Sequence, residues 1–317
     1  MKTLQVENLT LCFGNKKAVD NLSLDIYENE IVGLVGESGC GKSLTAFSML
    51  SIIPPGSTLT GKVIYKGQNL LSLESEAIRQ IRGNKISLIP QDPMSSLNPV
   101  FTVGDQITEV LEAHKSIKHN DALRFAKTKL EEVNIPNPSS RLNDYPYQFS
   151  GGMRQRVLIT MALANEPDIL IADEPTTALD VTIQLQILEL MKNLKNKGKS
   201  ILLITHDLAV VSEICDRVYV MYMGKIVESA SIKEIFLSPR HPYTIGLINS
   251  LPDENKKKLS PIKGQLPNLG SIPTGCAFHP RCDFIFERCK KELPDLYDVK
   301  ALKEHKSRCF LEVKSEK

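Results

Sequence analysis

The chain has 317 residues, enough for two domains, and its 39 basic and 37 acidic residues leave a net charge of +2. This balance excludes a strongly basic surface, so we expect no nucleic-acid partner. No apolar stretch approaches the length that crosses a bilayer, and the first residues lack the apolar segment of a signal peptide. We therefore expect a cytosolic protein that reaches a membrane only through other subunits.

The first elements predicted along the chain are antiparallel strands. Residues 3–27 alternate apolar and polar positions around turns at Gly14-Asn15 and Asp20-Asn21, the pattern of half-buried strands joined by tight turns. The apolar run at 31–35 has the length of a fully buried strand. A helix is expected from Leu44 to Ile53, where a pair of prolines stops it.

Between that strand and that helix, residues 36–43 fit the phosphate-binding pattern G-x-x-x-x-G-K-[ST]. The glycines let backbone N–H groups close around an anion, and the helix N-terminus favours negative charge. Lys42 supplies a point charge for the outer phosphates, and Ser43 offers its hydroxyl to Mg²⁺. A glycine-rich turn without a ligand is the alternative, but the flanking strand and helix favour a nucleoside triphosphate. The residues expected to bind it are Gly36, Glu37, Ser38, Gly39, Cys40, Gly41, Lys42, Ser43 and Leu44.

Strands and helices alternate over most of the remaining chain. A short strand pair flanks Gly67, and 103–133 has helical spacing of its apolar residues. Further strands are predicted at 85–90, 169–172, 201–205 and 218–223. Such alternation is typical of an α/β fold with a parallel sheet covered on both faces. The block near 92–160 is then a helical insertion.

The predicted strand at 169–172 ends in two carboxylates, Asp173 and Glu174. At the end of a strand, Asp173 can reach a Mg²⁺ ion shared with Ser43 and the phosphates. Glu174 would lie beside the terminal phosphate, where it polarises a water molecule. In isolation such a pair usually marks a surface turn after a core strand. Because it follows a P-loop pattern here, we expect a catalytic pair.

A second turn, Phe149-Ser150-Gly151-Gly152-Met153, opens another predicted helix and is a second backbone anion site. One nucleotide does not need two such sites from the same chain. We therefore expect ATP to be sandwiched between two subunits, with Ser150, Gly151, Gly152 and Met153 serving the nucleotide of the partner.

Taken in order, six features resemble the ATPases of ABC transporters. They are the P-loop, Gln91, Ser150-Gly151-Gly152, Asp173-Glu174, Ala178-Leu179-Asp180 and His206. The resemblance covers residues 1 to about 235 and implies a P-loop ABC ATPase with a RecA-like core, an antiparallel β subdomain and a helical insertion. The family signature is Leu-Ser-Gly-Gly-Gln, from which this chain departs at Phe149 and Met153 while it keeps the anion-binding Ser-Gly-Gly.

The same resemblance assigns roles to single residues. Phe13 stacks on the adenine, Gln91 contacts Mg²⁺ or the attacking water, and His206 contacts the terminal phosphate. Asp180 lies in the loop that crosses the dimer interface. The implied catalytic residues are Glu174, His206 and Gln91, and the implied Mg²⁺ ligands are Ser43, Gln91 and Asp173.

Four further segments resemble oligopeptide and dipeptide importers, most closely the D-type ATP-binding subunits of dipeptide permeases. They are 91–99, 149–156, 241–244 and 275–282. This resemblance implies an ATP-hydrolysing subunit at the cytoplasmic face of the inner membrane, with 1–237 as the ATPase domain and 238–317 as a C-terminal domain. The implied partners are a sister ATPase subunit, forming a heterodimer, two transmembrane permease subunits and, indirectly, an external peptide-binding protein. Closure of the ATPase dimer would move the permeases, which are held beside Gln91.

A soluble ABC ATPase that acts on ribosomes or DNA is the alternative function. DNA-repair members insert a long coiled coil between P-loop and signature, and the segment between Lys42 and Ser150 is too short for one. Translation-factor members carry two ATPase cassettes in one chain, and this chain has one. A sensing module with a vestigial ATPase site is a third class, and the complete catalytic set speaks against it.

Four of the seven cysteines, Cys276, Cys282, Cys289 and Cys309, cluster in a proline-rich tail with the spacing C-x5-C-x6-C-x19-C. The spacing is not that of a zinc ribbon or a bacterial ferredoxin, but four thiolates can converge on one metal centre if the loops fold back. Zinc and an iron–sulfur cluster both suit four cysteines, and unligated thiols or two disulfides are the alternatives. The resemblance to peptide importers favours a structural 4Fe–4S cluster over zinc. His279 and His305 are the histidines that could replace a cysteine ligand.

Overall fold

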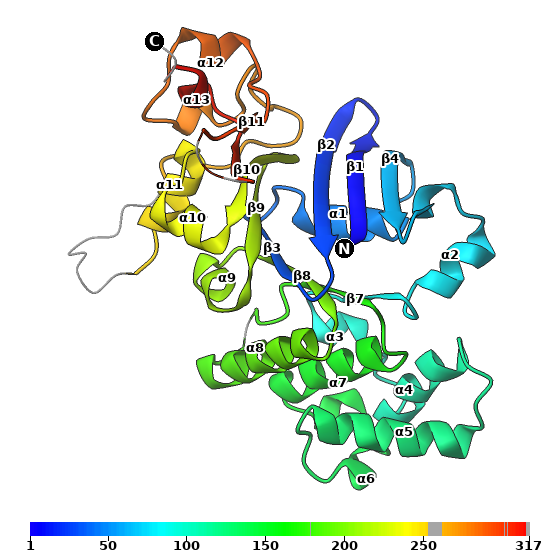
Figure 1. Ribbon diagram of the computed structural model, residues 1–317. Coiled ribbons are helices and arrows are strands. Elements are labelled where there is room, and N and C mark those ends of the chain that lie inside the picture. Colours follow the sequence, from blue (N-terminus) through cyan, green and yellow to red (C-terminus); the bar gives the residue numbers. More distant parts are fainter. Residues whose placement is uncertain (178, 253–261, 301, 303, 315–317) are drawn as a thin grey trace. The chain divides into compact units, whose positions relative to one another are not determined.

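The computed structural model describes residues 1–177, 179–252, 262–300, 302 and 304–314. The chain divides into two compact units (Figure 1). The first comprises Met1–Tyr27, Ile31–Leu71 and Leu203–Lys317, and the second comprises Glu28–Glu30 and Ser72–Leu202. Among the described residues, no helix is both long and apolar enough to cross a membrane.

The first unit contains two groups of strands. One is a sheet in the order β2-β1-β4-β5 with antiparallel neighbours, and Figure 1 shows β1, β2 and β4 side by side. The other has the order β11-β12-β10-β9-β3, in which β9 runs parallel to β3 and antiparallel to β10. All five residues of β3 are buried, as is typical of a strand covered on both faces. This strand leads directly into the predicted P-loop.

The elements of the first unit in chain order are β1 (Lys2–Phe13), β2 (Lys16–Tyr27), β3 (Ile31–Val35), α1 (Lys42–Met49), β4 (Ser57–Tyr65), β5 (Gln68–Asn69), η1 (Leu70–Ser72), α9 (Leu208–Ile214), β9 (Arg217–Tyr222), β10 (Lys225–Ser231), α10 (Ile232–Leu237), α11 (Pro242–Asn249), η3 (His279–Arg281), α12 (Glu287–Lys291), β11 (Tyr297–Asp298), β12 (Lys306–Ser307) and α13 (Leu311–Lys314). In the sequence, η1 and β8 (Ser200–Thr205) each run across the boundary between the two units.

The antiparallel strands predicted for 3–27 are confirmed, but one of their predicted turns is wrong. Asp20 and Asn21 lie inside β2, where the strand has an extra residue opposite Thr10 of β1. Asn21 takes a φ of 52°, and its N–H donates to Thr10 Oγ1 at 3.0 Å. The pair forms a β-bulge, because Asn tolerates the left-handed conformation in bulges as well as in turns.

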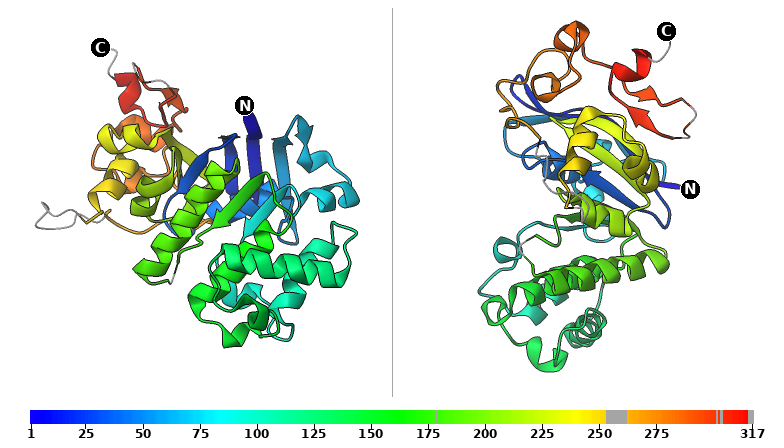
Figure 2. Two further views of the ribbon diagram at one scale, coloured as in Figure 1. Left: turned by 60° about the horizontal axis from the view of Figure 1, so that its bottom comes forward. Right: turned by 90° about the vertical axis from the view of Figure 1, so that its left-hand side faces the viewer.

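Helices dominate the second unit, and the helical spacing predicted over 103–133 is confirmed. It corresponds to two helices, α4 and α5, whose inward-facing side chains are almost completely buried. Figure 2 shows the helices of this segment, coloured cyan to green, gathered together.

Strands β6 and β7 run parallel, so their carboxyl ends, followed by Gln91 and Glu174, point the same way. The elements are α2 (Ser75–Ile81), β6 (Ile86–Ile89), α3 (Pro93–Ser96), α4 (Val103–Glu112), α5 (His119–Glu132), α6 (Pro138–Arg141), η2 (Pro146–Gln148), α7 (Gly151–Leu163), β7 (Ile169–Asp173) and α8 (Val181–Asn196).

A buried carboxylate fastens the C-terminal tail to β10. Glu228 accepts the backbone N–H groups of Arg240 at 2.7 Å and His241 at 2.9 Å, and its Oε1 lies 2.7 Å from Nε2 of His305. The side chains of Glu228 and His305 are fully buried, where a hydrogen bond is stronger than in water. Three segments of the first unit therefore meet at one carboxylate.

Candidate functional site

The turn between β3 and α1 depends on its glycines. Gly39 and Gly41 have φ values of +85° and +109°, which residues that carry a side chain rarely adopt. A Cβ on Gly36 would lie 2.3 Å from the carbonyl oxygen of Met221, so only glycine fits there. The sequence pattern has therefore produced a close turn that aims backbone groups at the start of a helix, the geometry that binds phosphate.

Lys42 begins α1 and is 5% exposed. Its ammonium donates to the carbonyl oxygens of Gly36 at 2.8 Å and Glu37 at 3.1 Å. Gly41, the N-cap residue, provides no side-chain acceptor for the N–H groups of the first turn. The cation and the helix N-terminus thus lie together at this turn, and both attract an anion.

The other residues predicted to bind the nucleotide line the same turn or its neighbourhood. Ser43 and Leu44 are half-buried in the first turn of α1, while Ser38 and Gly39 are exposed. Burial raises the pKa of the Cys40 thiol to about 11, so this thiol is neutral near pH 7. Phe13, at the end of β1, is half-buried and pairs with Lys16 and Ser57 in the sheet.

The second unit brings Gln91 and Glu174 into direct contact. The amide nitrogen Nε2 of Gln91 donates to Oε2 of Glu174 at 3.1 Å, and the hydroxyl of Thr177 donates to the same oxygen at 2.9 Å. Glu174 is buried and has a φ of 46°, a strained conformation for a residue with a side chain and one that clusters at functional sites. Thr177 was missed by the sequence analysis, although it lies only three residues after Glu174.

Asp173 is buried at the end of β7, and His206 is exposed just after β8. Lys42, Ser43 and His206 belong to the first unit, whereas Gln91, Asp173 and Glu174 belong to the second. The roles that would join these residues around one nucleotide stay predictions.

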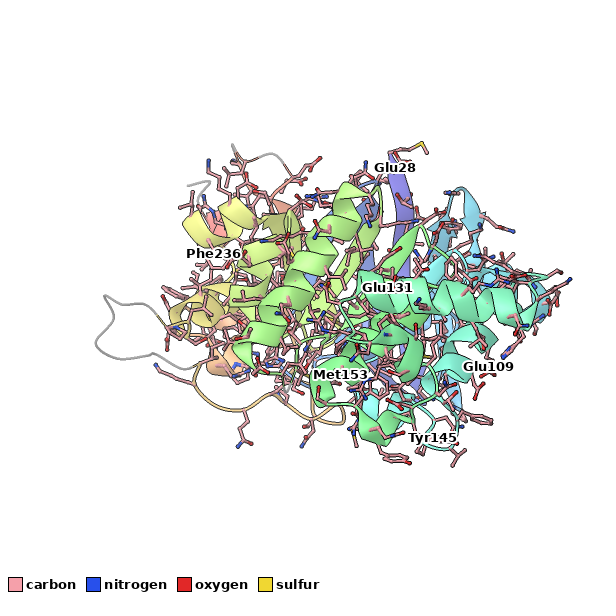
Figure 3. All side chains as sticks on the ribbon, turned by 90° about the horizontal axis from the view of Figure 1, so that it is seen from below. Glu28, Glu109, Glu131, Tyr145, Met153 and Phe236 are labelled. Atoms are coloured by element: carbon pink, nitrogen blue, oxygen red, sulfur yellow. The ribbon has the colours of Figure 1, made fainter. Side chains whose placement is uncertain are left out.

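The Ser150 turn also opens a helix, α7. The Ser150 hydroxyl is the N-cap and accepts the N–H of Met153 at 3.3 Å, while Gly151 is exposed and has nothing within 4 Å of a Cβ built on it. Figure 3 labels Met153 in the first turn of this helix. The turn has the geometry of an anion site and is open to solvent.

The first turn of α8 packs against the Ser150 turn. Asp180 caps α8 by accepting the N–H of Ile183 at 2.9 Å, and a Cβ on Gly152 would lie 2.8 Å from Cγ2 of Ile183. Gly152 therefore permits the close approach of the two helix starts. Ala178, which belongs to the same predicted motif, lies outside the described residues.

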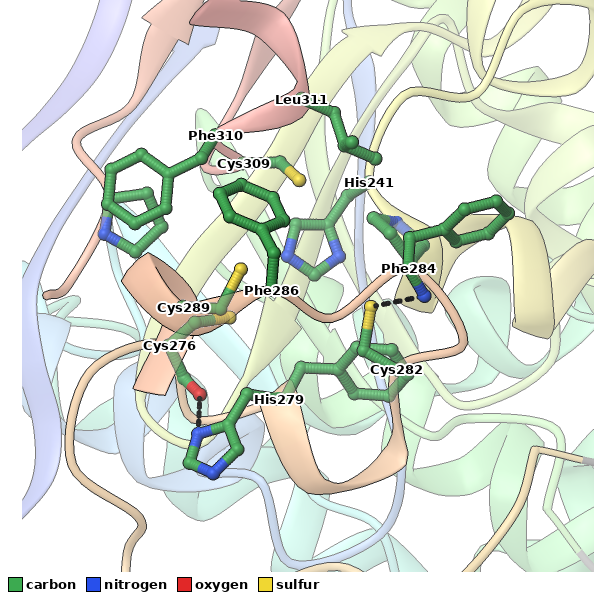
Figure 4. A pocket seen from close by; sticks show the side chains of 13 residues that line it. His241, Cys276, His279, Cys282, Phe284, Phe286, Cys289, Cys309, Phe310 and Leu311 are labelled. Carbon is green, nitrogen blue, oxygen red and sulfur yellow. Dashed lines mark hydrogen bonds between the residues drawn. The ribbon is translucent and has the colours of Figure 1, made fainter. Parts of the chain in front are cut away.

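The four clustered cysteines all line one cavity in the first unit. Figure 4 shows their sulfur atoms facing the space between them, with Phe286 and His241 beside them. All four are free thiols. Burial raises the pKa values of Cys276 to about 11 and of Cys309 to about 12, and the other thiols around the cavity contribute to both shifts. The loops of the tail therefore bring all four cysteines to the lining of one cavity.

The two histidines considered as replacement ligands differ in position. His279 lines the cavity, and its Nδ1 lies 3.0 Å from the carbonyl oxygen of Cys276. His305 is paired with Glu228 and is not among the lining residues. His241, which sequence analysis missed, lines the cavity, and burial lowers its pKa to about 4. Within the described part of the chain, no group of three or more His, Cys, Asp or Glu side chains is arranged to hold a metal ion.

Comparison with known proteins adds two family matches. The profile of the ABC transporter family matches residues 19–177, and that of the oligopeptide/dipeptide transporter C-terminal region matches residues 227–289. Among solved structures, a dimeric ATP-binding cassette bound to ADP and phosphate, MJ0796, is 28% identical with a TM-score of 0.65, and the match covers 72% of this chain and 98% of that one.

Similar curated proteins are ATP-binding proteins of peptide transport. A dipeptide transport ATP-binding protein of Bacillus subtilis, DppD, is 50% identical over 92% of this chain and 90% of its own length. An oligopeptide transport ATP-binding protein of the same organism, AppD, is 47% identical over 97% of this chain and 96% of its own. The DppD of Haemophilus influenzae is 46% identical over 94% of this chain and 93% of its own.

Proposed function

The chain belongs to the ABC transporter family of ATPases, and on that premise we propose that it is the ATP-hydrolysing subunit of an importer of dipeptides or oligopeptides. The observation that carries the proposal is the match of its tail to the oligopeptide/dipeptide transporter C-terminal region, beside a matched ATPase region. The relatives act in peptide transport, which does not favour a soluble ATPase of ribosomes or DNA.

ATP binds at the P-loop in this proposal. Lys42 neutralises the outer phosphates, Ser43 and Asp173 hold Mg²⁺, and Phe13 stacks on the adenine. The proposal is supported by the buried cation at the start of α1 and by the glycine conformations of the turn.

Hydrolysis is assigned to Glu174, which polarises the attacking water, with Gln91 and His206 as the further catalytic residues. The Gln91–Glu174 hydrogen bond supports this assignment, because it aims the amide at the carboxylate that must orient the water. The second hydrogen bond, from Thr177, leaves one carboxylate oxygen with two donors and holds the group in place.

A second ATPase subunit completes the nucleotide site. We assign Ser150, Gly151, Gly152 and Met153 to the nucleotide bound by that subunit, and Asp180 to the interface between the two. The exposure of Ser150 and Gly151 supports this, because an anion carried by another molecule can reach them. A sister subunit of the same family, forming a heterodimer, is the proposed partner.

An exposed apolar face of the second unit is the proposed contact with two transmembrane permeases. Met94, Phe101 and Tyr147 have exposed fractions of 64%, 51% and 69%. Arg154 connects two of these residues, since its guanidinium donates to the sulfur of Met94 and to the carbonyl oxygen of Tyr147. Large apolar side chains that are exposed on one face are typical of an interaction site. The subunit would then lie peripherally on the cytoplasmic face of the inner membrane, with an external peptide-binding protein as an indirect partner.

The finer domain division is also a proposal. We assign 1–237 to the ATPase domain, about 92–160 to its helical subdomain and 238–317 to the C-terminal domain. The helices α3 to α7 support the second of these, and the family match that begins at 227 and ends at 289 supports the third.

The cysteine cavity is the proposed site of a 4Fe–4S cluster held by Cys276, Cys282, Cys289 and Cys309. The residues fit the group, because four free thiols line one cavity and thiolates are the ligands of such clusters. Zinc is the alternative occupant, because it also accepts four cysteine thiolates. When bound, the cluster would supply folding energy to the tail.

The cluster can be tested by composition. Protein purified without oxygen should be brown and carry iron with acid-labile sulfide, and Cys282→Ser should bleach it and expose the tail to proteases. Cys12→Ser, a half-buried cysteine outside the cavity, is the matched control and should change neither property. Stoichiometric zinc without sulfide would show that the cavity holds zinc and not an iron–sulfur cluster. Four freely alkylated thiols without metal would exclude both a cluster and zinc.

The transport function is tested by reconstitution. Proteoliposomes that contain this subunit, its sister ATPase and the two permeases should take up a labelled dipeptide only with the binding protein and ATP. Uptake and ATP turnover should both stop in Glu174→Gln. ATP turnover that no peptide stimulates, together with no uptake of any tested di- to pentapeptide, would refute the peptide-import function.

A further inference from the structure

Glu37, the second residue of the P-loop, is held by side chains from distant parts of the first unit. Its backbone N–H donates to the hydroxyl of Tyr243 at 2.8 Å, and Nη1 of Arg281 lies 3.0 Å from both of its carboxylate oxygens. Tyr243 and Arg281 are 206 and 244 residues away in the sequence. A P-loop binds phosphate with its own backbone donors, so phosphate binding alone does not require these contacts.

Arg281 is fixed on several sides. Its side chain is 6% exposed, its Nε donates to the carbonyl oxygen of Lys263 at 2.8 Å, and its Nη1 lies 3.4 Å from the hydroxyl of Tyr222. The guanidinium also lies over the rings of Tyr222 and Phe278, at 5.9 and 5.8 Å from their centroids. A charge-assisted bond from such an immobile donor restrains the carboxylate of Glu37 much more than a flexible surface pair would.

Tyr243 is equally constrained. It is completely buried, and its ring packs against Tyr222 at 4.7 Å and Phe278 at 5.4 Å between centroids. Burial raises the pKa of its hydroxyl well above the usual value, so the group remains neutral and continues to accept the N–H of Glu37. Both backbone and side chain of Glu37 are therefore held by residues beyond position 240.

Glu37 in turn contacts the Lys42 ammonium of the proposed phosphate site. Its carbonyl oxygen accepts a hydrogen bond from the Lys42 ammonium at 3.1 Å. The neighbouring carbonyl oxygen of Gly36 accepts a second hydrogen bond from the same ammonium at 2.8 Å. The carbonyl oxygen of Glu37 also accepts the N–H of Cys40 at 3.3 Å, which closes the turn. A shift of Glu37 would consequently move the ammonium and the backbone donors together.

We propose that Arg281 and Tyr243 are positioning residues, which hold Glu37 and, through it, the Lys42 ammonium where the outer phosphates bind. The C-terminal tail then sets the affinity of the ATP site without touching the nucleotide. This inference rests on the proposed nucleotide site and extends it to residues that lie outside every ATPase motif. Because Arg281 directly precedes Cys282, the segment that lines the cysteine cavity also restrains the P-loop.

The test is equilibrium binding of MgATP to the purified full-length chain, followed by steady-state kinetics of the assembled transporter. Losing one hydrogen bond to a charged group should weaken binding by roughly tenfold in Arg281→Gln and in Glu37→Gln. The double variant should be no weaker than either single variant, because both break the same contact. Arg281→Lys keeps the charge and should recover part of the affinity. In each case KM for ATP should rise more than kcat falls, which a merely destabilised fold would not produce.

Arg79→Gln is the matched control, because Arg79 donates to exposed Glu76 at 2.9 and 3.0 Å on α2, in the other unit. It should bind MgATP within about twofold of the unaltered protein, as surface pairs contribute little. If Arg281→Gln fails to fold, Glu37→Gln and Tyr243→Phe test the proposal in its place. Each of them leaves the Arg281 side chain packed against its neighbours. Normal MgATP affinity in folded Glu37→Gln and Tyr243→Phe would overturn the positioning role. An unaltered protein that binds no MgATP would instead overturn the nucleotide site itself.

Discussion

The two glycine-rich turns of the chain share a chemistry but differ in what surrounds them. The P-loop is enclosed, because backbone atoms of Ala18 and Met221 lie where a side chain on Gly41 or Gly36 would have to go. The Ser150 turn is exposed, with open space beside Gly151. Both start helices and both suit an anion. The proposed roles match this difference, because the enclosed turn is assigned to this chain's own nucleotide and the exposed turn to the nucleotide of a partner subunit.

The supports of the two turns differ in the same way. The P-loop is held by Tyr243 and Arg281, which come from the far end of the chain. The Ser150 turn is held by its own N-cap and by the neighbouring Ile183 of α8. A turn supported locally can approach a second molecule without disturbing a distant part of the fold.

If the P-loop binds the nucleotide and other residues hydrolyse it, a substitution can abolish ATP hydrolysis and leave ATP binding intact. Glu174→Gln should show this separation most strongly. The amide keeps the shape but cannot act as a base, so turnover should fall by about a hundredfold or more while MgATP binding is retained. Phosphate release and equilibrium binding measure the two effects. Near-normal turnover, with contamination by unaltered protein excluded, would remove Glu174 from its role.

Lys42→Ala tests the enclosed turn. Removing the buried ammonium eliminates the charge that the outer phosphates meet, so MgATP affinity should fall by roughly ten- to a hundredfold. AMP, which lacks the outer phosphates, should be affected much less. Equal losses for ATP and AMP would show that the substitution had collapsed the turn instead.

Ser150→Arg tests the exposed turn and should have the opposite pattern. The isolated subunit should bind MgATP within about twofold of normal, because the turn does not serve its own nucleotide. ATP-dependent closure and turnover of the assembled transporter should be lost. Ser139→Arg, at an exposed position of α6, controls for the added charge and bulk. Full turnover in the assembled Ser150→Arg transporter would contradict the comparison.

Thr177→Val should have the smallest effect. It removes one of the two hydrogen bonds to Oε2 of Glu174 and keeps the side-chain shape, so turnover should drop severalfold with MgATP affinity unchanged. The Gln91 bond remains to orient the carboxylate. A loss as large as that of Glu174→Gln would assign Thr177 a larger part in hydrolysis than orientation.

Local motifs were readable from the sequence because each depends on a few consecutive residues. The P-loop required a strand, a run of glycines and a helix, and β3 lies where the pattern predicted, while α1 ends at Met49, four residues before the predicted end at Ile53. The wrong turn at Asp20-Asn21 has a related cause, since the same residue types suit turns and bulges.

Long-range contacts were not readable in this way. The sequence analysis expected a structural metal centre at the four cysteines of the tail. The structure adds a buried Glu228–His305 bond between residues 77 positions apart, which no periodic pattern marks. The Arg281–Glu37 contact is likewise invisible in sequence, because an arginine before a cysteine does not reveal which carboxylate it will meet.

Vanadate-directed photocleavage tests most directly whether the P-loop lies at this chain's own nucleotide and the Ser150 turn at the nucleotide of the partner subunit. In the assembled transporter, MgADP and vanadate take the place of the nucleotide at the moment of hydrolysis, and irradiation cleaves the backbone beside the trapped vanadate. We predict cleavage of this chain at two places, within residues 36–43 and within residues 150–153, with the second cut abolished by Ser150→Arg. Cleavage confined to residues 36–43 in the unaltered transporter would contradict the account.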